Sequence, residues 1–186
     1  MSLWGASSSD ESKPKNLTTT EKAEVFANQK GWVVRAGSTR TGNGNTAATP
    51  EVLVALGGLS TALAAATISS TEFDISSFDV SAGGTLSVTV NYNEQITVAG
   101  SPTIAVTNSQ AGGGSAASLT LTKSASTANT VTFTLVVGAA GSTISADDIL
   151  SIGAQNVLLA GGTITDTVAT TAAAVAVSAA AGAGAG

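Results

Sequence analysis

The sequence predicts a mainly β protein, in which an antiparallel β-sandwich follows an extended N-terminal arm with one short helix. The first observation is an alternation of apolar and hydroxyl residues with a period of two between residues 85 and 137. Such alternation over short runs is typical of strands with one face on a core and the other in water. The second is the frequency of turn signals, such as Gly83-Gly84 and Gly161-Gly162, with no long helical period between them. Together they favour a sandwich over a fold with alternating strands and helices.

The N-terminal arm is expected to be extended over residues 1–17, where Ser, Asp, Lys and Pro dominate. Leu3 and Trp4 are the exceptions, and an exposed tryptophan on a polar arm is typical of an interface anchor. The alternative is that the tip of the arm folds back onto its own domain. After the arm, the segment from Thr18 to Glu21 has the pattern of a capping box, which predicts a short helix over about 21–29.

The remaining elements are expected to be short strands. Residues 31–35 and 51–56 have the composition of strands, and the loop between them is rich in Gly and Asn. The strands of the sandwich are expected near 67–75, 85–92, 95–99, 103–107, 118–123, 130–137, 156–160 and 163–168. We therefore predict three parts: an arm and attachment region over 1–60, a sandwich over 61–178, and an Ala/Gly tail over 179–186.

The composition excludes several kinds of chemistry. The 186 residues include no cysteine and no histidine. The chain therefore has no disulfide framework and no zinc-thiolate site, and it lacks the usual general base near neutral pH. It has no DxDxDG calcium loop. We predict that the protein is not an enzyme and has no cofactor, while binding of calcium or host glycans by the sandwich stays open at this stage.

Charge is distributed unevenly along the chain. Residues 1–50 carry six bases and four acids, a net charge of +2, whereas residues 51–186 carry one base and eight acids, a net charge of −7. The acidic sandwich would repel nucleic acid and anionic membranes at long range. The basic arm would favour an acidic protein surface, unless its scattered bases are only solvated.

The segments NYNEQITVAGSPTIAVTN, ANTVTFTLVVGAAGSTISADDIL and LLAGGTITD carry a first resemblance, over about residues 67–170. In order and spacing they resemble the bacterial Ig-like repeats of large surface adhesins. The turn GAAGSTISADD is less acidic here than in those repeats. The resemblance implies an immunoglobulin-like sandwich that serves adhesion or display, and it supplies no catalytic residues.

A second resemblance covers residues 1–60. The opening MSLWG and the segments TEKAEVFANQKGWVVRAG and PEVLVALGGLS are similar to small virion proteins of marine T4-like tailed phages. This resemblance implies a structural component of the capsid or tail whose N-terminal portion attaches to the particle.

The two resemblances lead to one expectation about function. We expect a bacteriophage virion protein, a capsid decoration (cement) protein that binds the assembled head through its N-terminal region and lies on the surface of the particle. Its expected partners are the major capsid protein or other virion proteins, with a possible homo-oligomer and no nucleic acid or membrane. The expected contact residues are Leu3, Trp4, Lys13, Lys15, Phe26, Trp32 and Arg35. The alternatives are a neck, tail or fibre protein, and an adhesion module for host surfaces or carbohydrates.

Overall fold

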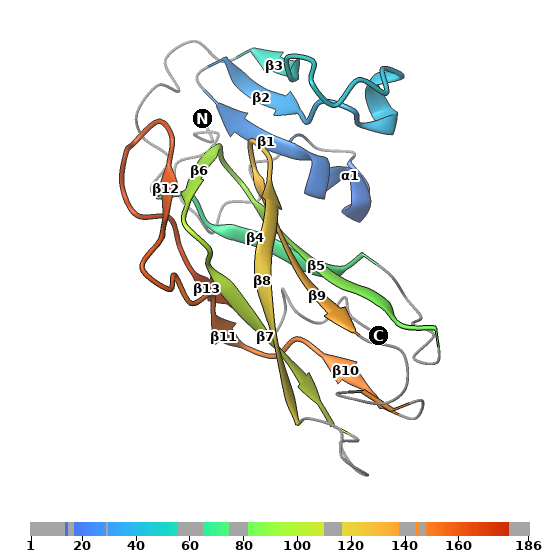
Figure 1. The fold of residues 1–186 in the computed structure, drawn as a ribbon. Coiled ribbons are helices and arrows are strands. Elements are labelled where there is room, and N and C mark those ends of the chain that lie inside the picture. The colour runs from blue at the N-terminus through green and yellow to red at the C-terminus, as the bar shows by residue number, and fades with distance from the viewer. Residues whose placement is uncertain are drawn as a thin grey trace.

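The computed structural model confirms the predicted fold class: the chain is mainly β, and its named strands pair in the antiparallel sense (Figure 1). The described residues are 14, 17–28, 30–55, 65–74, 82–109, 117–137, 144–145 and 148–178. The elements are α1 (Thr19–Glu24), β1 (Val25–Asn28), β2 (Gly31–Val34), η1 (Thr39–Thr41), β3 (Glu51–Ala55), β4 (Ile68–Phe73), β5 (Gly84–Tyr92), β6 (Ile96–Ala99), β7 (Thr103–Asn108), β8 (Ser118–Ser126), β9 (Thr130–Val137), β10 (Leu150–Ser151), β11 (Gln155–Asn156), β12 (Thr163–Asp166) and β13 (Ala176–Val177).

The body of the protein is built on a six-stranded sheet with the order β10-β7-β8-β9-β5-β4. Its centre is the pairing of β5 with β9, which runs in register from Gly84↔Val137 to Asn91↔Thr130. Along β5, the side chains of Leu86, Val88 and Val90 are buried, as the period of two predicts.

Two short strand pairs, β12–β6 and β11–β13, supply the second layer. Their apolar residues join the same core as the large sheet: Ile96 and Ile164 come from β6 and β12, and Val177 comes from β13. Apolar faces of the large sheet and the small pairs therefore bury each other, which is the arrangement of a β-sandwich. The immunoglobulin-like assignment stays a prediction.

Most of the strand expected over 156–160 does not form. Only Gln155–Asn156 forms β11, and Leu158 makes an isolated bridge to Thr103. After this bridge the chain leaves β7, because Leu159 and Ala160 lead into a tight turn in which Ala160 has a positive φ of 49°. The apolar run 157–159 thus contributes one bridge rather than a full strand.

Residues 17–55 form what we call the N-terminal unit, drawn in blue to cyan at one end of the sandwich in Figure 1. It contains α1 and a three-stranded sheet with the order β1-β2-β3. Its small core comprises the buried residues Val25, Ala27, Trp32 and Val34, with Leu17 and Val54 packed against them.

The helix expected over 21–29 was wrong in its second half, because α1 ends at Glu24 and residues 25–28 form β1. Val25 and Phe26 are β-branched and aromatic residues, which favour strands. Pairing of β1 with β2 from Val25↔Val34 to Asn28↔Gly31 buries these side chains. Tertiary pairing therefore outweighs the helical tendency of the segment.

Among the described residues, a backbone junction joins the N-terminal unit to the body. Ala27 of β1 forms a parallel bridge to Glu94, and the Ala27 N–H donates to the carbonyl of Asn93 at 2.9 Å. The predicted boundary at residue 60 and the Ala/Gly tail over 179–186 both lie outside the described residues.

Candidate functional site

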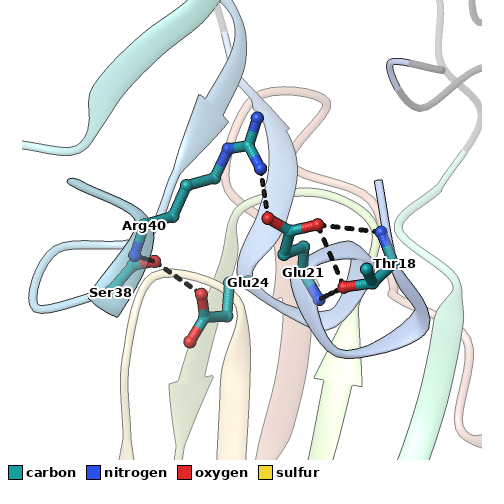
Figure 2. Close-up of polar contacts among 5 residues, drawn as sticks. All are labelled: Thr18, Glu21, Glu24, Ser38 and Arg40. Atoms are coloured by element: carbon teal, nitrogen blue, oxygen red, sulfur yellow. Dashed lines mark hydrogen bonds and ion pairs between the residues drawn. The ribbon is translucent and has the colours of Figure 1, made fainter. Parts of the chain in front are cut away.

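A polar network shapes the outer loop of the N-terminal unit (Figure 2). The predicted capping box is present: the Glu21 N–H donates to Thr18 Oγ1 at 3.3 Å, and the Thr18 N–H donates to Glu21 Oε2 at 2.8 Å. Glu21 also pairs with Arg40, while the Ser38 hydroxyl donates to Glu24 at 2.5 Å. Helix α1 therefore fixes the start of the loop between β2 and β3.

The same contacts affect the titration of Glu21. Hydrogen bonds from the backbone N–H and the hydroxyl of Thr18, together with the charge of Arg40, lower the pKa of this carboxyl group. The network therefore persists at neutral pH, where the carboxylate is ionised.

The exposed apolar surface of the N-terminal unit lies on β3. The side chains of Val52 and Leu53 are 44% and 36% exposed. Within the described part of the chain, only β2 pairs with β3, which makes β3 the outer strand of its sheet. An apolar edge strand is a ready site for association with another chain. The sequence predicted an apolar strand here, but it gave no sign that this strand would be the exposed one.

A groove of about 530 Å³ separates the N-terminal unit from the polar face of the six-stranded sheet. The unit contributes Glu24 and Arg35, and the sheet contributes Glu72, Asp74 and Thr89. The lining therefore mixes carboxylates, hydroxyls, one amide and one guanidinium with small apolar residues, and none of the described residues in it is aromatic.

The carboxylates of the groove are spaced for hydrogen bonding rather than for a metal ion. Glu72 accepts a hydrogen bond from the Ser70 hydroxyl at 2.9 Å, and Asp74 accepts one from Ser87. The described residues contain no group of three or more acidic, His or Cys side chains that could hold a metal ion. The polar side chains of the groove can both donate and accept hydrogen bonds.

Three of the seven expected contact residues lie in the described part of the chain. Phe26 and Trp32 are buried inside the chain, which corrects their assignment as surface anchors; they project from opposite faces of the β1–β2 pair, and Trp32 belongs to the small core. Arg35 is half-buried and lines the groove. The other four, Leu3, Trp4, Lys13 and Lys15, lie outside the described residues.

Sequence reasoning missed a buried pair of carboxyl groups, Glu94 and Asp166, which are only 7% and 1% exposed. The alternation of inward and outward residues along the strands could have indicated this burial. Glu94 continues the even-numbered, inward register of β5, and Asp166 shares the register of the buried Ile164 on β12. An acid at an inward position of a strand is unusual and needs a partner.

Comparisons with known proteins give no family for the chain. No protein-family model matches it, and neither the curated proteins nor the solved structures include a match. In the described part of the chain, no helix has the length and apolar character needed to cross a membrane.

Proposed function

We propose that the protein is a structural component of a bacteriophage particle, a decoration protein that binds the assembled head through its N-terminal unit. The sandwich is the displayed body, and the N-terminal unit is the attachment device. The partner is the major capsid protein or another virion protein.

The observation that carries the proposal is the exposed apolar edge of β3. Val52 and Leu53 present apolar side chains on the outer strand of the unit. Apolar contact with a partner would bury this surface, and backbone pairing along the edge would add direction to the contact. The resemblance of residues 1–60 to small virion proteins supports the same role.

The physical consequence of such binding is stabilisation of the assembled shell. A protein that binds only the assembled state shifts the equilibrium toward that state by mass action. Because residues 61–178 carry seven acids and one base, a net charge of −6, neighbouring copies would repel one another unless they were held by the shell.

The test is co-sedimentation of the full chain with empty capsids. Leu53→Asp should weaken binding at least about 10-fold, because a charge on the edge strand must be desolvated at the interface. Leu158→Asp is the matched control, since Leu158 is a 63% exposed leucine on the body. Equal binding by the two variants and the unmodified protein would refute attachment through β3.

The copy number on the particle separates the head from the neck, tail or fibre. Hundreds of copies per particle would support decoration of the head. Six or twelve copies would place the protein in the neck or tail, where the same edge strand would bind a different virion protein.

The groove favours a second candidate, binding of host-surface carbohydrate. Its carboxylates and hydroxyls can hydrogen-bond to a saccharide, although its lack of a described aromatic platform argues for weak binding. Glycan-array binding by the full chain that is lost in Asp74→Asn but kept in Glu51→Gln, which lies outside the groove, would support this candidate. Absence of binding to any glycan would remove it.

A further inference from the structure

The three residues between β5 and β6, residues 93–95, tie separate parts of the protein together, and we call them the crossover. The carbonyl of Asn93 accepts from the N–H of Ala27 in the N-terminal unit at 2.9 Å. The carbonyl of Gln95 accepts from the N–H of Thr167, directly after β12, at 2.9 Å. The crossover therefore contacts both the N-terminal unit and the second layer of the sandwich.

The side chain in the middle of the crossover is the buried Glu94. Asp166 pairs with Ile96, two residues after Glu94, so the two buried side chains lie on the same inward side of the crossover and β12. Oδ1 of Asp166 accepts two backbone N–H groups, from Val168 and Ala169, each at 2.8 Å. Oδ2 of Asp166 is buried and has no hydrogen-bond partner among the described residues. Two adjacent carboxylates cannot both be ionised at low cost, whereas one proton between them satisfies both groups.

We propose that Glu94 and Asp166 share one proton, and that this proton holds the crossover in place and so keeps the N-terminal unit docked on the sandwich. The protonated Glu94 donates to Oδ2 of Asp166. Loss of the proton leaves two negative charges facing each other in a buried site, and the crossover must then move to admit water. The inference is independent of what the N-terminal unit binds.

No neighbouring base can replace the proton. The described segments packed around the crossover bring no Lys or Arg: β1, β6 and the turn over 127–129 contain no ionisable side chain, and β12 brings only Asp166. Tyr92 ends β5, but burial raises its pKa far above the neutral range, so its hydroxyl stays uncharged. Among these segments, Asp166 is therefore the acidic neighbour of Glu94, and no basic side chain faces it.

The direction of the pH effect follows from the titration of Glu94. Burial, and then the charge and hydrogen bond of Asp166, raise the pKa of Glu94 from 4.5 to about 8. The folded protein therefore binds this proton more tightly than the unfolded chain does. Its contribution to stability is complete below pH 4.5, declines as the pH rises from about 4.5 to about 8, and is absent above that range.

The test compares the full-length protein with Glu94→Gln between pH 5 and pH 9. The Tm of the unmodified protein should fall by about 5 °C or more between pH 5 and pH 9. The Tm of Glu94→Gln should not fall in this way, because the amide of Gln can donate to Asp166 Oδ2 at every pH. Glu72→Gln, which removes an exposed glutamate from the same body, should keep the original profile. Identical profiles for Glu94→Gln and the unmodified protein would overturn the proposal.

A second measurement reports on docking itself. The Ala27 amide should lose protection against hydrogen exchange at pH 9 relative to pH 6, after correction for intrinsic rates, while the Val88 amide at the centre of β5 should not. In Asp166→Asn, which removes the facing charge, the loss at Ala27 should disappear. Protection of Ala27 that does not change with pH in the unmodified protein would refute the role in docking.

Discussion

At the scale of single residues, Gln155 shows how one side chain completes a sheet. β10 pairs with one end of β7, and Leu158 bridges to Thr103 at the other end. Between them, the Gln155 amide takes the place of a strand: its Nε2 donates to the Ala105 carbonyl at 2.6 Å, and its Oε1 accepts from the Ala105 N–H at 2.9 Å. The backbone groups of β7 are thereby satisfied where no strand reaches them.

Gln155→Ala should lower the free energy of unfolding by about 1–3 kcal/mol, because both backbone groups of Ala105 lose their partner in a partly buried position. Asn156→Ala is the control, since Asn156 is the adjacent, exposed residue of β11. Chemical denaturation of both variants checks the expectation. A loss no larger in Gln155→Ala than in Asn156→Ala would show that water replaces the amide without cost.

Residue-scale roles were the hardest to predict from the sequence. Phe26 and Trp32 are large aromatics in a basic region, which is equally typical of an interface anchor and of a small core. Only the pairing of β1 with β2 decides between these roles. Glu94 and Gln155 are similar cases, because their partners, Asp166 and Ala105, are separated from them by 50 residues or more along the chain.

At the scale of elements, two glycines allow β6 and β12 to meet. Gly100 follows β6 with a φ of +77°, which favours glycine, and Gly162 precedes β12. A Cβ atom on Gly162 would lie 2.3 Å from the carbonyl oxygen of Ala99, and one on Gly100 would lie 2.7 Å from the Gly162 Cα atom. The sequence marked Gly162 as part of a turn, but its close approach to Gly100 depends on the pairing of the strands.

Gly162→Ala should destabilise the protein by about 1–3 kcal/mol, because the added methyl group meets backbone that cannot move independently. Gly153→Ala provides the control, since a Cβ atom there would meet nothing within 4 Å. Thermal unfolding should show a lower Tm for Gly162→Ala and little change for Gly153→Ala. Equal Tm values would mean that the ends of β6 and β12 separate easily.

Element types were predicted better than element ends. The alternation over residues 85–137 correctly predicted β5, β8 and β9, because the period of two directly reflects burial of one face. The capping box was correctly predicted, because Thr18 and Glu21 interact locally, although α1 begins at Thr19 rather than at about residue 21. The end of α1 could not be predicted in this way, since it is set by pairing with β2.

At the scale of the whole molecule, the buried apolar residues of the described chain form two separate clusters, apart from Phe26 and Val33, which belong to neither. The large core joins both layers of the sandwich, whereas the small one contains Val25, Ala27, Trp32 and Val34 of the N-terminal unit. A small core buries little apolar surface, so the unit should open at a lower free energy than the sandwich. The sequence separated an N-terminal region over 1–60 from a sandwich over 61–178, but the two cores depend on how the strands pair.

Hydrogen exchange of two matched variants tests this division. Val34→Ala and Val131→Ala each remove two buried methylene equivalents, a loss of about 2 kcal/mol, one from each core. Val34→Ala should speed exchange in β1 and β2 while leaving β5 and β9 unchanged, because only the unit loses stability. Val131→Ala should speed exchange in β5 and β9. If Val34→Ala instead accelerated all four strands equally, the unit and the sandwich would unfold as one cooperative structure, and the N-terminal unit could not undock by itself.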